Sequence, residues 1–392
     1  MTMTSRERVT AALNHREPDR TPIFEYVLLS PVADALLGRR YAADPANWAA
    51  VVGDVGWEAA VRQNAIDRLD LAELLGHDML YVTPNPLPPA PPAEPAPSPP
   101  APTEDPVERV RRRNERAAQA SATPHPDTRR VYVMLHEEMA RRGIDLPILA
   151  PAWSHGVWTD VDLMQTMVLE PDVAHEHFAQ ATRRSLAAAE GYLALGIDLV
   201  GVGGDFAGNR PLISPEAYRT FIVPEIRKVT DRIHRGRDVR GGEVGSRQSA
   251  VGSEGEEGGG RGSGGGRRAW AVNASDGNLW SVIDDYLIGC GVDGYAEIDF
   301  HAGMDMGRLK AAYGDRITLF GNLDCGNVLS FGSPSDVRRH TLDCLEAGMG
   351  DGGHILCVSN AVTASVPVAN YVSVVAAYRE RFGLPALSLP PL

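Results

Sequence analysis

The sequence predicts an α/β protein, and more specifically a (β/α)8 TIM barrel in a single domain with two disordered insertions. Two observations carry this prediction. Eight short apolar runs alternate with helix-like segments along the chain, which is the pattern of parallel strands joined by helices. Removing two low-complexity tracts from the 392 residues leaves a length that is ordinary for one barrel. The strand count alone leaves a doubly wound parallel sheet open as the alternative.

The predicted strands are short runs of apolar and β-branched residues, the composition of strands that are buried on both faces. In chain order they are residues 21–27, 79–83, 146–151, 197–203, 269–273, 292–298, 316–320 and 354–359.

The predicted helices rest on periodicity and on residues suited to helix ends. Thr4 with Glu7 forms a capping-box pattern, and Ser333 with Pro334 places an N-cap ahead of a proline at the first helical position. The other predicted helices are residues 32–37, 48–75 (mixed, mostly helical), 109–119 (helical or poorly ordered), 131–142, 160–169, 171–195, 214–233, 278–288, 307–314 and 367–382.

Two tracts cannot supply a packed core. Residues 84–106 are dominated by Pro and Ala, which favours an exposed polyproline insertion. Residues 235–268 are rich in Gly, Ser and Arg and hold almost no apolar side chain, so we expect disorder there. We expect residues 1–392 to form the barrel around these two insertions.

Composition excludes several classes of function. The net charge of −13 argues against a nucleic-acid partner, which needs a basic face. No apolar run nears the length of about 18 residues that spans a membrane, and the N-terminus is charged where a secretory signal needs an apolar core. We therefore expect a cytoplasmic protein without a membrane partner. The four cysteines form no CxxC pair, which disfavours a cysteine-rich zinc module.

Polar side chains follow the predicted strands, where a barrel places its chemistry. They are Glu25, Asp205, Asp276, Glu297, Asn322, Asp324 and Asn360. Carboxylates in such a set bind a metal, act as general acid and base, or cap loops and helices. Capping is the plainer interpretation of any one residue, whereas the set as a whole favours a functional site.

Within this set we predict individual roles. Asp205, which follows two glycines, and Asp276 are the predicted catalytic pair, and His155 is the predicted proton carrier. Asp276, Glu297 and His301 are the candidate metal ligands. For each histidine, a polar loop residue without catalytic role is the alternative.

The predicted contacts to a small-molecule substrate come from several strand ends. Arg210 follows the fourth strand and suits a substrate carboxylate; an arginine that only faces solvent is the alternative. The other predicted substrate-binding residues are Glu25, Tyr26, Asn322, Asp324 and Asn360.

Five stretches resemble the uroporphyrinogen decarboxylase superfamily. They are SRERVTAALNHREPDRTPI, GGDFAGNRPLISPEAYRTFIVPEI, NASDGNLWSVIDDYLIGCGVDGYAEID, GMDMGRLKAAYGDRITLFGNLDC and GGHILCVSNAVTASVPVANYVSVVAAYRERFG. The resemblance covers nearly the whole chain outside the two tracts. It implies a (β/α)8 barrel, and an enzyme that either decarboxylates tetrapyrroles or moves methyl groups between corrinoid proteins and other acceptors. It is also consistent with a homodimer.

The chain departs from both branches of that superfamily at informative places. The decarboxylases carry an arginine-rich RQAGRY motif after the first strand, where this chain has residues 24–29 (FEYVLL), and a histidine after the last strand, where it has Asn360. The methyltransferases bind zinc through an HxCG motif, which here reads Ala274 to Gly277 (ASDG), and through a later cysteine that falls on Asn360. The resemblance thus implies a divergent, methyltransferase-like member.

The hypothesis that follows is methyl transfer, linked to a corrinoid on a partner protein, or decarboxylation of a small anionic substrate. A divalent metal such as zinc is the other cofactor that the resemblance implies. The alternatives are a true uroporphyrinogen decarboxylase, and a barrel that binds a corrinoid or tetrapyrrole without catalysis.

Overall fold

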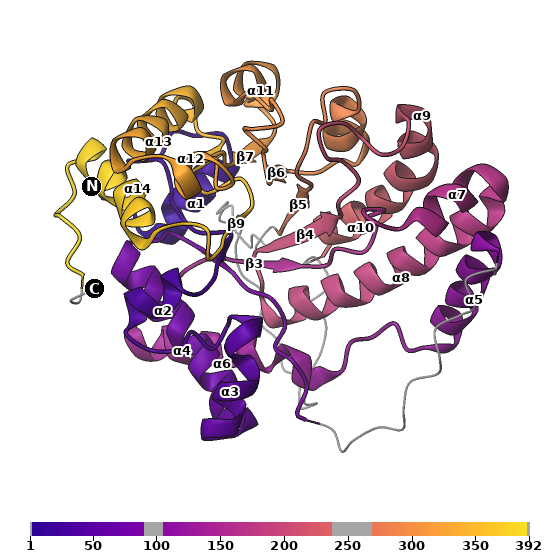
Figure 1. Ribbon diagram of the computed structural model, residues 1–392, viewed down its shortest axis with the longest axis horizontal. Helices are drawn as coiled ribbons and strands as arrows, with labels where there is room; N and C mark the ends of the chain where they lie inside the picture. Colours follow the sequence, from indigo (N-terminus) through magenta and orange to yellow (C-terminus); the bar gives the residue numbers. More distant parts are fainter. Residues whose placement is uncertain (1, 90–104, 237–268, 390–392) are drawn as a thin grey trace, which may run out of the picture.

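A parallel sheet surrounded by helices forms the body of the protein (Figure 1). The computed structural model describes residues 2–89, 105–236 and 269–389. Seven strands pair in sequence order from β2 to β8, all of them parallel, and β1 pairs with β9 in a second small parallel sheet. The strands are β1 Val27–Leu28, β2 Leu80–Tyr81, β3 Ile148–Pro151, β4 Leu199–Gly203, β5 Trp270–Ala274, β6 Gly294–Ala296, β7 Thr318–Phe320, β8 His354–Ile355 and β9 Ala361–Val362.

Helices connect the strands and cover the outer face of the sheet (Figure 1). They are α1 Ser5–Leu13, α2 Val32–Leu37, α3 Pro45–Val55, α4 Trp57–Leu75, α5 Pro106–Gln119, α6 Arg130–Arg142, α7 Val161–Leu169, α8 Pro171–Leu195, α9 Pro215–Ala217, α10 Val223–His234, α11 Met306–Tyr313, α12 Val328–Phe331, α13 Pro334–Gly348 and α14 Val368–Arg381. A short 3-10 helix covers Pro126–Arg129, and π-helical turns cover Tyr218–Ile222 and Asp285–Gly289.

The helix ends follow the sequence signals closely. Thr4 forms the predicted capping box with Glu7, and Ser333 is the predicted N-cap, which also forms a capping box with Asp336. Predicted helix 48–75 is two helices, because Gly56 has a φ of 82° and interrupts the chain between α3 and α4. The predicted helix 278–288 is helical only from residue 283 onward, where a short helical turn leads into the π-helical segment that ends at Gly289.

The sheet is curled, so that its inner face forms a core of its own. Leu149, Leu199, Val272, Phe320 and Ile355 come from five different strands and lie in one buried cluster. Their neighbours along the strands face outward and pack under the helices, as Val200 does beside Leu199. Burial on both faces explains why the strands are continuously apolar.

The first predicted strand, residues 21–27, contacts both edges of the seven-stranded sheet. Ile23 forms a parallel bridge with Leu356, just after β8, and the Asp78 N–H donates to the Ile23 carbonyl at 2.7 Å, just before β2. After Ile23 this first segment diverges from β2. Its end forms β1, which pairs with β9, a strand that the sequence did not predict. The gap that opens between β1 and β2 is called the seam below.

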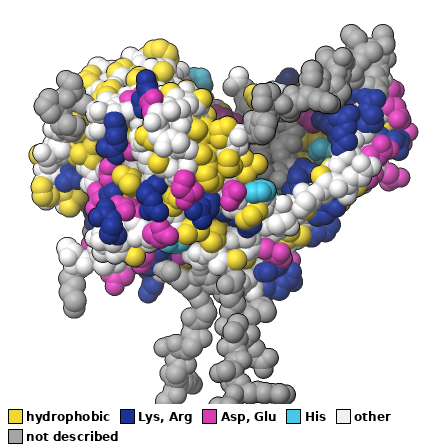
Figure 2. Space-filling view, turned by 90° about the horizontal axis from the view of Figure 1, so that it is seen from below, with side chains coloured by type: hydrophobic (Ala, Val, Ile, Leu, Met, Phe, Trp, Pro, Cys, Tyr) yellow, Lys and Arg dark blue, Asp and Glu magenta, His cyan; other side chains and the backbone are white. Residues whose placement is uncertain are grey.

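Parts of both predicted insertions, residues 90–104 and 237–268, lie outside the described residues. No helix in the described ranges has the length and apolar content needed to cross a membrane. On the face shown in Figure 2, acidic and basic side chains are interspersed. Basic side chains gather at its right-hand end, where Figure 1 places the arginine-rich α5.

Candidate active site

A cavity of about 370 Å³ lies at the carboxyl ends of the central strands. The residues that line it follow or end strands β3 to β6, apart from Tyr26, which precedes β1. They are Tyr26, Trp153, Ser154, Gly156, Trp158, Gly204, Asp205, Ala274 and Glu297. Three aromatic rings and two carboxyl groups thus face one small space, and none of the lining residues is Lys, Arg or His. We call this space the strand-end cavity.

Close packing of two loops sets the position of Asp205. Gly204 follows β4 with a φ of 149°, and a Cβ atom on it would lie 2.6 Å from the backbone nitrogen of Gly156. A Cβ atom on Gly156 would in turn lie 3.0 Å from the Asp205 backbone. Only glycine fits such an approach. The two glycines therefore let the loops after β3 and β4 touch and place Asp205 at the cavity.

Carboxyl groups from neighbouring strand ends raise one another's proton affinity. Burial, together with the charges of Asp205 and Asp299, raises the pKa of Asp276 to about 6. Burial, together with the charges of Asp205 and Asp276, raises the pKa of Glu297 to about 8. Burial also raises the pKa of Asp205. The site therefore holds at least one proton on a carboxyl group at neutral pH.

Glu297 is held in an uncommon backbone conformation. It follows β6 with a φ of 63°, in the left-handed region that non-glycine residues seldom occupy. Its carboxyl group hydrogen-bonds Tyr26, which also hydrogen-bonds Tyr81. The Trp153 Nε1–H donates to the Tyr81 hydroxyl at 3.2 Å. Backbone conformations of this kind cost about 1–3 kcal/mol and occur preferentially at functional sites.

Three of the residues predicted from sequence meet at this site. The Asn360 side-chain amide donates to the Asp276 carboxylate at 3.0 Å, which links the segment after β8 to the end of β5. The backbone of Asp276 hydrogen-bonds Asp205. Asn360 thus fixes the orientation of the Asp276 carboxylate beside the strand-end cavity.

Other predicted residues lie elsewhere. His155 is fully buried between the lining residues Ser154 and Gly156, and its Nε2 contacts the Thr182 hydroxyl at 3.0 Å. Burial lowers the pKa of His155 to about 4, so it is neutral and does not face the cavity. Arg210 is exposed on the turn after β4.

The polar side chains of the loop after β7 are engaged in hydrogen bonds within the protein. The Asn322 side-chain amide donates to the Met304 carbonyl at 3.0 Å, and Asp324 accepts the Asn327 N–H at 3.0 Å. Both residues are almost fully buried, and neither lines the strand-end cavity. Their described contacts stabilise the loop.

The residues present do not fit the zinc site that the resemblance implies. Its histidine and cysteine positions hold Ala274, Asp276 and Asn360. Within residues 2–89, 105–236 and 269–389, no group of three or more His, Cys, Asp and Glu side chains is arranged to hold a metal ion. His301, a predicted ligand, lies on an exposed turn. The predicted metal site thus finds no matching ligand group in the described residues.

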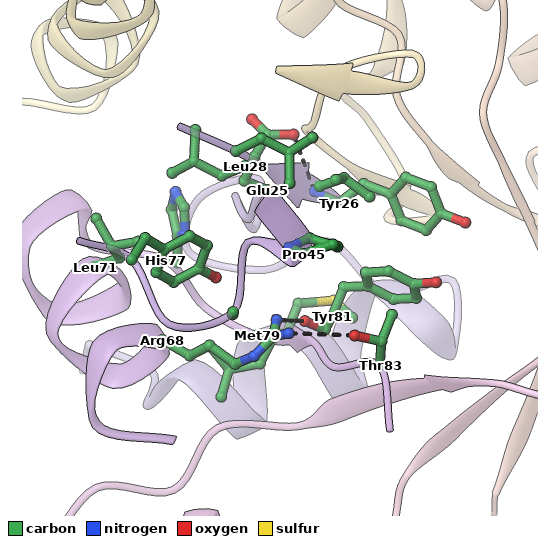
Figure 3. A pocket seen from close by; sticks show the side chains of 15 residues that line it. Glu25, Tyr26, Leu28, Pro45, Arg68, Leu71, His77, Met79, Tyr81 and Thr83 are labelled. Atoms are coloured by element: carbon green, nitrogen blue, oxygen red, sulfur yellow. Dashed lines mark hydrogen bonds between the residues drawn. The ribbon is translucent and has the colours of Figure 1, made fainter. Parts of the chain in front are cut away.

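A second cavity, of about 240 Å³, fills the seam between β1 and β2 (Figure 3). Glu25 lines it, and burial raises the pKa of Glu25 to about 8, despite hydrogen bonds from the Tyr26 N–H, the Tyr371 hydroxyl and the Val358 backbone. Tyr26 lines both cavities. We call this space the seam cavity.

Sequence reasoning found Tyr26 but missed the other aromatic residues of the site, Tyr81, Trp153 and Trp158. Tyr81 ends β2, and Trp153 and Trp158 follow β3. Their position near strand ends was the only signal in the sequence, because aromatic residues in or beside apolar runs usually belong to the core. Asp299 was missed as well, because its influence on Asp276 depends on how the loops after β5 and β6 pack.

The fold and the cavity define an α/β protein with an acidic, aromatic-walled site at the carboxyl edge of a parallel sheet. Residues 273–381 match the family described as uroporphyrinogen decarboxylase (URO-D). A uroporphyrinogen decarboxylase from Aromatoleum aromaticum is 24% identical over 269 residues, and the match spans 65% of this chain and 65% of the length of that relative. A methyltransferase from Methanosarcina mazei has a similar structure, with a TM-score of 0.63 and 16% identity, covering 97% of this chain and 99% of that one.

These matches support a likeness to the uroporphyrinogen decarboxylase superfamily, and the family match itself lies in residues 273–381. The likeness to the methyltransferase, at its low identity, concerns the fold. The two named relatives are both enzymes, one a decarboxylase and one a methyltransferase.

Proposed function

We propose that this chain is an acid–base enzyme built on a (β/α)8 barrel, with its reaction in the strand-end cavity. The observation that supports this best is the difference in proton affinity between two neighbouring carboxyl groups. Asp276 has a pKa of about 6 and Glu297 a pKa of about 8. At neutral pH Glu297 keeps its proton while Asp276 is mostly ionised. Environments that separate the pKa values of two carboxyl groups are typical of general acid–base sites.

The reaction we propose is methyl transfer from a small methylated molecule. The bond between the methyl carbon and a heteroatom of the substrate breaks, and its electron pair stays on the heteroatom. Glu297 gives its proton to that heteroatom, while the methyl group passes to an external nucleophile. The aromatic walls formed by Tyr26, Trp153 and Trp158 suit the apolar part of such a substrate. The methyltransferase fold of the structural relative agrees with this choice.

The methyl acceptor would come from a partner. A corrinoid, which the resemblance implies, supplies a strongly nucleophilic metal centre when it is bound. A corrin ring is much larger than the cavity of about 370 Å³, which supports a corrinoid that stays on a partner protein. The residues described above would act on the substrate, and a corrinoid protein would approach from outside.

Decarboxylation is the second candidate, because the matching family and the curated relative are decarboxylases. In that reaction the bond from carbon to carboxylate breaks, carbon dioxide leaves, and Glu297 protonates the carbanion. The lining of the strand-end cavity disfavours it. No cation among the lining residues would hold a substrate carboxylate beside Asp205 and Glu297. We therefore place methyl transfer first.

Glu297→Gln tests the proposed acid. We expect it to lower kcat/KM for methyl transfer about 10²- to 10⁴-fold, because the amide cannot give up a proton. The first assay measures methyl transfer from a panel of methyl ethers, methylamines and methyl thioethers to free cob(I)alamin. A parallel assay measures the release of carbon dioxide from a panel of carboxylates that includes uroporphyrinogen. The wild-type kcat/KM should fall as the pH rises through about 8, where Glu297 loses its proton.

Asp276→Asn gives a second readout in the same assay. Because the Asp276 charge raises the pKa of Glu297, its removal should move the alkaline limb of the profile to lower pH. Asp315→Asn, at an exposed side chain, is the matched control and should leave the profile unchanged. Full activity in Glu297→Gln, or an unmoved limb in Asp276→Asn, would contradict the proposed roles. Absence of both reactions in the wild-type protein would favour a non-catalytic binding protein.

A further inference from the structure

The seam cavity is apolar over most of its wall. Its apolar lining residues are Tyr26, Val27, Leu28, Leu29, Tyr41, Ala43, Pro45, Leu71, Met79, Leu80 and Tyr81. The cavity volume of about 240 Å³ exceeds the roughly 150 Å³ of an engineered protein cavity that binds benzene. The space therefore suits a body the size of one ring or a short branched chain.

Polar groups stand on two sides of this apolar space. Figure 3 shows Glu25 on one side, and Arg68 with Thr83 on the other. Glu25 is protonated at neutral pH because burial raises its pKa to about 8, and His77 is neutral because burial lowers its pKa to about 3. The Arg68 guanidinium, on α4, is thus the charge that the cavity wall presents at neutral pH.

No ion pair to a carboxylate holds Arg68 among the described residues. Its Nε–H donates to Asn64 at 2.9 Å, and Nη1 donates to the Tyr81 carbonyl at 2.8 Å. Nη2 makes one long contact to the Thr83 hydroxyl, at 3.4 Å. A guanidinium has five N–H donors, so one donor on each terminal nitrogen is left. These two remain available to donate to a bound carboxylate.

We propose that the seam cavity binds a small organic acid, whose carboxylate pairs with Arg68 and whose apolar body fills the space toward Leu71 and Met79. A half-buried cation without a carboxylate partner at the edge of an apolar cavity favours an anion, because the apolar wall weakens the screening on that side. The neutral Glu25 side chain makes no competing ion pair. This site is separate from the strand-end cavity, although Tyr26 lines both.

Calorimetric titration with benzoate at pH 7 tests the inference, with benzyl alcohol as its neutral counterpart. We expect saturable 1:1 binding of benzoate, and binding of benzyl alcohol at least ten-fold weaker. Arg68→Gln should weaken benzoate binding about ten-fold or more and leave benzyl alcohol unaffected. Arg62→Gln, on the same helix but exposed and paired with Glu137, removes the same charge outside the cavity and should change neither.

Ala43→Leu provides a variant that keeps the charge. Ala43 lines the cavity, so the larger side chain should weaken the binding of benzoate and of benzyl alcohol alike. This variant tests the site if Arg68→Gln does not fold. Three outcomes would overturn the assignment. Benzoate does not bind, its binding survives Arg68→Gln or Ala43→Leu, or benzyl alcohol binds as tightly as benzoate. Because binding is measured without turnover, this result is independent of the outcome for Glu297.

Discussion

At the scale of single residues, buried carboxyl groups set the pH behaviour of this protein. Glu25 and Glu297 both have a pKa of about 8, and burial is the largest cause in each case. A group whose pKa is raised on folding favours the folded state below its unfolded pKa and loses that advantage as the pH rises through the folded value. For Glu25 the window lies between the ordinary 4.5 and about 8.

Glu25→Gln should therefore reduce the pH dependence of stability. Wild-type unfolding free energy is expected to fall between pH 5 and pH 8.5, and the variant should fall less. At pH 8.5 the variant should be more stable than the wild type by at least about 1.4 kcal/mol, the equivalent of one pKa unit, because glutamine can still accept the Tyr26 N–H. Urea titrations at both pH values measure this, and parallel curves for the two proteins would contradict it.

For several residues the sequence predicted the position at a strand end but not the direction of the side chain. His155 lies between two cavity-lining residues and faces the opposite way. Asn322 follows β7, as predicted, but its amide is bonded inside the protein. Asp205 and Asp276 reached the site because each follows a strand whose extent the apolar run made clear.

At the scale of elements, glycines decide how neighbouring strands pack. Gly201 lies in β4, and a Cβ atom there would come within 2.0 Å of the Trp153 ring, which follows β3. Trp153 therefore reaches its position over the sheet only because β4 has no side chain at that point. The same ring donates to Tyr81 and lines the strand-end cavity, so this contact links strand packing to the site.

Gly201→Ala should displace the Trp153 ring. We expect a loss of about 1–3 kcal/mol of stability, as in other overpacked cores, together with a change in tryptophan fluorescence. Gly53→Ala is the matched control, since a Cβ atom there meets nothing within 4 Å. It lies inside α3, where alanine favours the helix by about 1 kcal/mol, so this variant should gain stability. Equal changes in the two melting temperatures would rule out the packing argument.

At the scale of the whole molecule, the sequence predicted the alternation of strands and helices well, but not how the sheet closes. Seven of the eight predicted strands overlap a strand of the parallel sheet, because strands buried on both faces are continuously apolar. Residues 21–27 are equally apolar, yet they meet β1 only at Val27. Pairing there depends on contacts with residues far along the chain, near 78 and 356, which local patterns cannot show.

A buried ionic network holds the N-terminal segment against β2 at the one point where the seam is closed. Asp78 is fully buried, and its carboxylate contacts Arg8 at 2.5 Å and Arg20 at 3.1 Å. It also accepts the Ser5 hydroxyl at 2.9 Å and the Ile23 N–H at 3.2 Å. The same residue thus joins α1, the first predicted strand and the start of β2, and it limits how far the seam opens.

Asp78→Asn should therefore weaken the whole fold. Loss of the charge removes one of the two carboxylates that pair with the buried Arg8, the other being Asp19 at 2.6 Å, which should cost about 1.5–3 kcal/mol. Asp54→Asn breaks the exposed pair with Arg40 and should cost less than about 1 kcal/mol. Urea unfolding compares the two variants, and hydrogen exchange shows where the loss begins. The amides of Ile23 and Asp78, which bond across the closed end of the seam, should lose protection before those of β4 and β5. Equal losses in both variants, or uniform exchange across the sheet, would show that the network does not hold the seam.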